Sequence, residues 1–142
     1  FALGIDPIHI VVTRGKNDTD VLWAMEESLR IPSIMAVVGE LGNVSLTHSR
    51  RLQLAAESSG VTAFILRYSG DTSVSAAVTR WLIAPQPSVA ATERFIRWQL
   101  ELWRCRGGMS KKWLVEWDNE TNNFTVAPIL RHGTSKSKRA NA

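Results

Sequence analysis

One stretch of the chain, from Val37 to Arg67, reads VVGELGNVSLTHSRRLQLAAESSGVTAFILR and has the pattern strand–helix–strand. Its two ends are apolar runs without polar alternation, which is typical of strands buried on both faces. Between them, Ser45 or Thr47 can cap a helix at its start, and Gly60 follows its end. Two strands joined by a crossover helix predict a parallel sheet with helices packed on it.

The same alternation extends upstream. Asn17 or Asp18 can cap a helix over Val21–Ile31, where apolar residues recur at helical spacing, and Pro32 stops it. Before this helix, the short β-branched run IHIVVTR predicts another buried strand. The predicted parallel strands are therefore Ile8–Arg14, Ser33–Leu41 and Val61–Ser69.

Downstream of these strands the crossover helices stop. Gly107-Gly108 and Asn119–Asn122 supply turns between segments that alternate like strands. In the longest segment, Ile96, Trp98, Leu100 and Leu102 face one way, so this half predicts an antiparallel meander that extends the sheet. The four meander strands are Ser75–Pro85, Glu93–Arg106, Lys111–Asp118 and Asn123–Leu130.

Composition indicates one ordinary globular α/β domain over residues 1–130. Hydrophobic residues make up 44% and charged residues 21% of the 142, and no apolar run approaches the roughly 18–20 residues of a membrane span. One cysteine, Cys105, excludes an internal disulfide and a cysteine-based metal site, and it favours a reducing cytoplasm. Residues 131–142 predict a disordered basic tail.

Catalytic motifs are missing from the sequence. It has no phosphate loop and no nucleophile elbow, and its three histidines are scattered, so we predict no catalytic residue and no metal ligand set. Glu40 ends a predicted parallel strand, where α/β proteins place metal or nucleotide chemistry, although a solvated strand end is the alternative. Candidate residues for a partner surface, which a solvated helix face would also explain, are Arg50, Arg51 and Trp23.

The order of strands, helices and meander resembles the C-terminal part of a RecA-like core. More closely, the chain resembles the ImuA family, RecA-like proteins encoded with an error-prone polymerase in bacterial mutagenesis cassettes. The resemblance covers roughly residues 2–130. The stretches that carry it are AVVGELG, SRRLQLAAESSGVTAFILR, SAAVTRWLIAP and RWQLELWRCRGG with WLVEWD.

This resemblance implies a three-layer RecA-like core that lacks its N-terminal, phosphate-loop side in this chain. It further implies a non-catalytic adaptor in damage-induced (SOS) translesion DNA synthesis, which binds the polymerase-like protein of the cassette and, as a further candidate partner, RecA. The start at Phe1, within an apolar stretch, agrees with a piece of a longer protein.

Two site expectations come from the resemblance. In RecA, the matching strand ends in two basic residues that reach the phosphates of ATP on the neighbouring subunit. Arg104 and Arg106 stand at these places and imply a phosphate or subunit-interface contact, with an exposed basic strand end as the alternative. RecA also has a metal-holding aspartate where this chain has Gly39, with Glu40 one residue later.

Two alternatives stay open from sequence. A full-length protein with an upstream phosphate loop would bind ATP and magnesium and could be an ATPase that assembles on DNA as a homo-oligomer. The stretch Val37–Arg67 also resembles SulA, the cell-division inhibitor family that binds FtsZ. The sequence leaves contact with DNA undecided.

Overall fold

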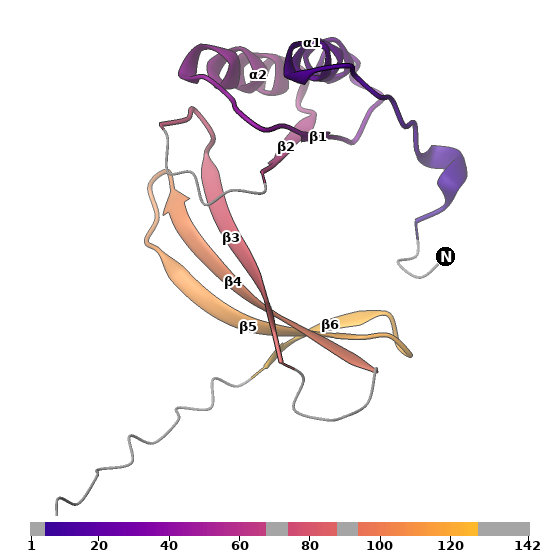
Figure 1. The fold of residues 1–142 in the computed structure, drawn as a ribbon, viewed down its shortest axis with the longest axis vertical. Coiled ribbons are helices and arrows are strands. Elements are labelled where there is room, and N and C mark those ends of the chain that lie inside the picture. The colour runs from indigo at the N-terminus through magenta and orange to yellow at the C-terminus, as the bar shows by residue number, and fades with distance from the viewer. Residues whose placement is uncertain (1–4, 68–73, 88–93, 128–142) are drawn as a thin grey trace, which may run out of the picture.

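The computed structural model describes residues 5–67, 74–87 and 94–127. Its elements are arranged as a helical layer on a short parallel strand pair, from which a twisted antiparallel sheet extends (Figure 1). The predicted tail over residues 131–142 lies outside the described residues. In chain order the elements are η1 (Pro7–His9), α1 (Asp18–Leu29), β1 (Ala36–Glu40), α2 (Leu46–Ser59), β2 (Thr62–Leu66), β3 (Thr79–Gln86), β4 (Phe95–Cys105), β5 (Lys111–Asp118) and β6 (Asn123–Ala127).

The predicted strand–helix–strand unit is confirmed as β1, α2 and β2, with β1 and β2 parallel. The Ser45 hydroxyl accepts the His48 backbone N–H at the start of α2. Gly60 ends the helix at φ +78°, in the left-handed region that glycine adopts without strain. The amide oxygen of Asn17 caps α1 in the same way, so that this helix begins three residues earlier than predicted.

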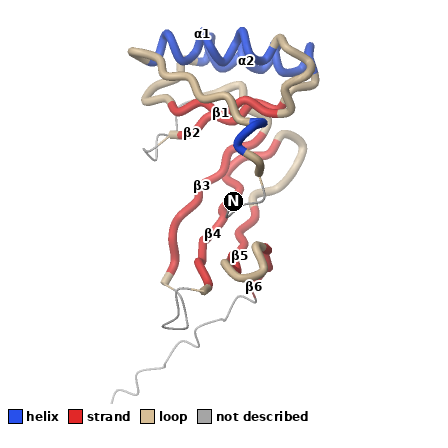
Figure 2. The backbone as a smooth tube through the Cα atoms, turned by 90° about the vertical axis from the view of Figure 1, so that its right-hand side faces the viewer, coloured by secondary structure: helices blue, strands red, loops and turns tan. Residues whose placement is uncertain are grey.

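Both helices lie on one face of the parallel pair, as Figure 2 shows from the side. The core between helices and strands is formed by Leu22, Met25, Leu29, Leu41, Val44, Leu52 and Val61. The described residues leave the opposite face of the pair uncovered, with Val38 60%, Phe64 51% and Leu66 51% exposed. The prediction of strands buried on both faces is therefore wrong, and the described residues form two layers here instead of three.

The prediction of a strand at Ile8–Arg14 is also wrong. Asp6 caps the short 3₁₀ turn Pro7–His9 by accepting the Ile8 N–H, and the segment after it forms no ladder. Val11 and Val12 are 88% and 87% exposed. The physical reason is that a β-branched run becomes a strand only where a neighbouring strand pairs with its backbone, and in the described residues β1 pairs with β2 alone.

The meander is confirmed as four antiparallel strands in the order β3-β4-β5-β6. It forms a sheet of its own within the described residues, because β3 pairs with β4 and not with β2; the expectation of one continuous sheet is thus corrected. No helix in the described part of the chain is long and apolar enough to cross a bilayer.

One face of the antiparallel sheet, which we call the apolar sheet face, collects large hydrophobic side chains. Residues directly opposite in register share a face, and the pairs Ile83–Leu100, Trp98–Val115 and Trp117–Phe124 all lie on it. Trp98, Trp113 and Trp117 share this face; Trp117 is buried, and Trp98 and Trp113 are half-buried. The other face carries ion pairs such as Lys112–Glu101 at 2.9 Å.

Candidate functional site

The two arginines singled out by sequence lie at the end of β4, and a bulge decides which face they present. Trp81 pairs with Leu102 but Arg80 pairs with Arg104, so Trp103 is an extra residue in β4. Simple alternation would place Arg104 on the apolar sheet face, together with Leu102. The bulge moves it to the polar face, opposite Arg80. Arg106 follows two residues later, in the turn after β4, and its N–H donates to the Val78 carbonyl.

Ser75, which lies between the helical layer and the antiparallel sheet, accepts hydrogen bonds from the guanidinium groups of Arg80 and Arg104. Arg104 Nη1 donates to the Ser75 carbonyl at 2.8 Å, and Arg80 Nη2 donates to the Ser75 hydroxyl at 3.1 Å. The neighbouring Ala76 N–H donates at 2.9 Å to Ser49 Oγ, on the first turns of α2. Ser49 is only 5% exposed. This set of hydrogen bonds fixes the start of β3 and the end of β4 against α2.

We call Arg80, Arg104 and Arg106 the arginine edge. Within the described residues neither Arg104 nor Arg106 forms an ion pair with a carboxylate, and the exposed Arg106 side chain makes no hydrogen bond there. Gly107 then turns the chain at φ +76°, and Gly108 N–H donates to the Cys105 carbonyl at 3.2 Å. Guanidinium groups beside a tight turn can bind a phosphate or a carboxylate.

Glu40 does not join this edge through any contact in the described part of the chain. It is the last residue of β1, opposite Leu66, on the uncovered face of the parallel pair. Gly39 is buried on the opposite face beneath Met25, whose Sδ would lie 2.0 Å from a Cβ built on the glycine. A side chain at this position would displace Met25, and among the described residues no group of His, Cys, Asp and Glu could hold a metal ion.

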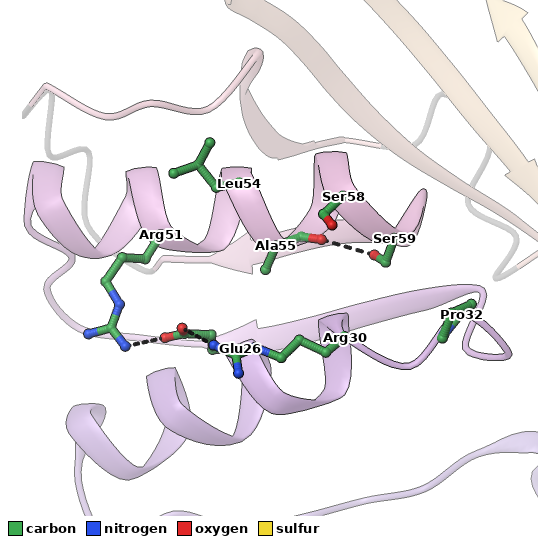
Figure 3. A pocket seen from close by; sticks show the side chains of 8 residues that line it. All are labelled: Glu26, Arg30, Pro32, Arg51, Leu54, Ala55, Ser58 and Ser59. Atoms are coloured by element: carbon green, nitrogen blue, oxygen red, sulfur yellow. Dashed lines mark hydrogen bonds and ion pairs between the residues drawn. The ribbon is translucent and has the colours of Figure 1, made fainter.

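The three candidate partner-surface residues lie on the helical layer, in different surroundings. Arg50 Nη1 donates to Gln53 Oε1 at 2.7 Å within α2, and Trp23 is 66% exposed on α1. Arg51 instead crosses to α1, where its Nη2 lies 2.6 Å from Glu26 Oε2. Figure 3 shows this pair at a groove between the two helices, with Arg30 on the other side of Glu26.

Sequence reasoning missed three residues of these sites. Ser75 holds two guanidinium groups of the arginine edge, Arg80 is one of the members of that edge, and Glu26 is shared by Arg30 and Arg51. The bulge that brings Arg80 and Arg104 together has no sequence signal, because it depends on register between two strands. The Glu26–Arg51 pair depends on how α1 and α2 pack.

Comparison with known proteins identifies a distant relative. The chain is homologous to Protein ImuA of Caulobacter vibrioides, in strain NA1000 / CB15N and in strain ATCC 19089 / CIP 103742 / CB 15, with 33% identity over 130 residues in each case. The match covers 82% of this chain and 53% of the relative, so the chain spans about half the length of the curated proteins it matches. No family model and no solved structure matches it.

Proposed function

We propose that this chain, a distant homologue of Protein ImuA, is part of a RecA-like adaptor that acts in damage-induced translesion DNA synthesis. In this proposal the adaptor binds the polymerase-like protein encoded in the same mutagenesis cassette and contributes no chemistry of its own. The observation that carries the proposal is the 33% identity that extends over 82% of the chain and therefore through both the helical layer and the antiparallel sheet.

The arginine edge is the surface that we assign to this function. Ser75 holds the guanidinium groups of Arg80 and Arg104, so part of this surface is already ordered before a partner binds. A preorganised surface loses less conformational entropy on association than a mobile one. Arg106, exposed beside them, then offers a full set of donors to a carboxylate or phosphate on the partner.

An adaptor role is favoured over ATP hydrolysis by the end of β1. The place of the metal-holding aspartate of RecA is taken by Gly39, which packs against Met25, so that a carboxylate there would displace the methionine side chain. Glu40 points to the uncovered face and makes no contact with the arginine edge within the described residues. The proposal therefore assigns Arg104 and Arg106 to protein contact and leaves Glu40 without a role in catalysis.

Co-purification tests this function directly. An affinity-tagged form of the chain is expressed with the polymerase-like cassette protein and, in a separate culture, with FtsZ. We expect capture of the polymerase-like protein alone. Capture of FtsZ alone would replace the proposal with a SulA-like inhibitor, and capture of neither partner would exclude both functions for this chain.

The double variant Arg104→Met/Arg106→Met locates the binding surface. It removes two positive charges at the end of β4, and we expect recovery of the partner to fall about tenfold or more because the variant cannot form charge-assisted hydrogen bonds at the interface. The matched control is Arg14→Met/Lys16→Met, which removes the same charge from two exposed residues in the segment before α1. An equal decrease in the two variants would show that overall charge, and not the arginine edge, determines binding.

A further inference from the structure

The apolar sheet face is a surface that the proposed function does not use. Both helices pack on the parallel pair, and the antiparallel sheet extends away from them, so no described helix packs along this face (Figures 1 and 2). The face is formed by alternate residues of all four strands. They run from Trp81 to Pro85, from Ile96 to Leu102, from Lys111 to Trp117 and from Phe124 to Val126.

The exposed part of this face lies on its two edge strands. Trp117, on the central strand β5, is 8% exposed. On the edge strand β3, Trp81 and Ile83 are 45% and 60% exposed, and on the edge strand β6, Phe124 and Val126 are 59% and 69% exposed. An occupant that covers this surface must therefore contact both edges of the sheet.

The face offers almost no charge to an occupant. Lys111, at the start of β5, is its single charged residue. The ion pairs of the sheet lie on the opposite face, where Lys112 contacts Glu101 at 2.9 Å. A nucleic acid needs several cations for its phosphates, and a charged peptide needs groups of the opposite sign. The face therefore fits an occupant that is itself apolar and uncharged.

The area of the face matches what a dimer needs. Its most exposed side chains, which are between 42% and 69% exposed, are Trp81, Ile83, Ile96, Phe124 and Val126. Because a large aromatic side chain has an area of about 150–250 Å² and an aliphatic one somewhat less, they expose on the order of 500 Å² together. Two such faces would bury about 1,000 Å², at which specific association of proteins begins.

The shape of the face favours another sheet over a single helix. At a strand spacing of about 4.8 Å, the edge strands β3 and β6 lie about 14 Å apart. A helix is only about 10–12 Å wide and does not reach both edges. A second sheet does, because sheets of the same hand of twist pack face to face with their strands within about 30° of each other.

We propose that the chain forms a two-fold dimer in which the apolar sheet faces of two copies pack on each other. A second copy presents the same apolar composition, the same near absence of charge and the same twist. Such an interface is isologous, so the paired faces cannot recruit a third copy. The bulge at Trp103 places Arg104 on the opposite sheet face, which the dimer leaves accessible. The inference is therefore independent of the proposed role of the arginine edge.

Light scattering of the full chain on a sizing column tests the proposal. Over loading concentrations from about 1 to 100 µM, we expect the measured mass to rise from that of one chain to that of two and to stay there. The mass of one chain at every concentration would overturn the proposal. Growth beyond two chains without a plateau would also overturn it, because it would show an open-ended contact.

Charge complementation assigns the dimer to the face. Ile83→Asp/Val126→Asp and Ile83→Lys/Val126→Lys each place like charges on both edges, so each variant alone should weaken the dimer about tenfold or more. An equimolar mixture of the two should recover it, since the copies then carry opposite charges. Recovery is expected whichever edges meet across the two-fold axis. Circular dichroism of each variant checks that it is folded.

The matched control uses two exposed residues outside both sheets. Val11→Asp/Val12→Asp and Val11→Lys/Val12→Lys should dimerise like the native chain, alone and mixed. An equal weakening in these controls would assign the association to exposed apolar residues in general and overturn the assignment. Folded sheet variants that dimerise like the native chain, or that stay monomeric when mixed, would also overturn it.

The two proposals of this chain fail separately. Arg104→Met/Arg106→Met should lose the polymerase-like protein in the co-purification but dimerise like the native chain. A loss of the dimer in this variant would show that the arginine edge, and not the apolar sheet face, joins the two copies.

Discussion

At the scale of the residue, Gly39 shows how closely α1 packs on β1. It lies in β1 under Met25 of α1, and an added Cβ would meet the sulfur at 2.0 Å and two carbons of the same side chain at 2.9 Å. We expect Gly39→Ala to lower the free energy of unfolding by about 1–3 kcal/mol, since overpacking forces the methionine from its place. Urea denaturation followed by circular dichroism measures the change.

The double variant Gly39→Ala/Met25→Ala tests whether the clash with Met25 causes the loss of stability. If the clash with Met25 destabilises the single variant, adding Gly39→Ala to Met25→Ala should cost clearly less than adding it to the native chain. Equal costs in both backgrounds would contradict the packing explanation and point to the backbone of β1.

Asp118 is the residue from which we expect a pH dependence. Its carboxylate accepts two hydrogen bonds from Arg94, at 3.1 and 2.8 Å, and one from the Glu120 N–H at 2.9 Å. The hydrogen bonds from Arg94, together with those from Glu120 and Thr121, hold the pKa of Asp118 well below its usual range. Its contribution to stability is therefore complete above the unfolded pKa of about 4 and is lost as the pH falls towards the lower, folded value.

The measurement is the denaturant midpoint as a function of pH. We expect the native chain to lose stability between about pH 5 and pH 2, and Asp118→Asn to show a shallower loss over the same interval. The effect should also shrink in high salt, because the Arg94 side chain is 40% exposed. Parallel curves for the two proteins would assign the acid sensitivity to other carboxylates.

At the scale of the element, a tryptophan in the antiparallel sheet is buried whereas a tryptophan on α1 is exposed. Trp117 of β5 is 8% exposed, with its ring centroid 4.6 Å from that of Phe124. Trp23 of α1 is 66% exposed. We expect Trp117→Ala to cost about 3–5 kcal/mol of stability and Trp23→Ala to stay within about 0.5 kcal/mol. Thermal melts of the two variants give this comparison, and similar decreases in stability would show that Trp23 is packed.

The elements also show what could be predicted from sequence. Caps and periodicity located both helices, because Asn17, Ser45 and Gly60 act on backbone groups within a few residues. Strand pairing depends on distant partners, which is why the run from Ile8 to Arg14 has the pattern of a strand although no strand lies beside it in the described residues. For the same reason the sequence indicates Arg104 and Arg106 but not the sheet face on which Arg104 lies. That face is set by the bulge at Trp103, which depends on the register between β3 and β4.

At the scale of the whole molecule, the main feature is apolar surface that no described element covers. The apolar sheet face keeps Trp81, Ile83 and Val126 at 45%, 60% and 69% exposed, and the parallel pair has its own uncovered side. Ion pairs and polar residues occupy the opposite side of the antiparallel sheet. Contiguous apolar surface of this kind marks an interaction site or promotes self-association.

We therefore expect the 142-residue chain on its own to bind the dye ANS and to elute from a sizing column earlier than a monomer at high concentration. Ile83 and Val126 lie on the two edge strands of the apolar sheet face, so Ile83→Thr/Val126→Thr should reduce both effects with little loss of stability. The control is Val11→Thr/Val12→Thr, whose side chains are more exposed still but lie outside both sheets. If the control reduced dye binding and association as much as the sheet variant, exposed hydrophobic residues in general would be responsible. A reduction in the sheet variant alone would identify the apolar sheet face as the surface that requires a covering partner.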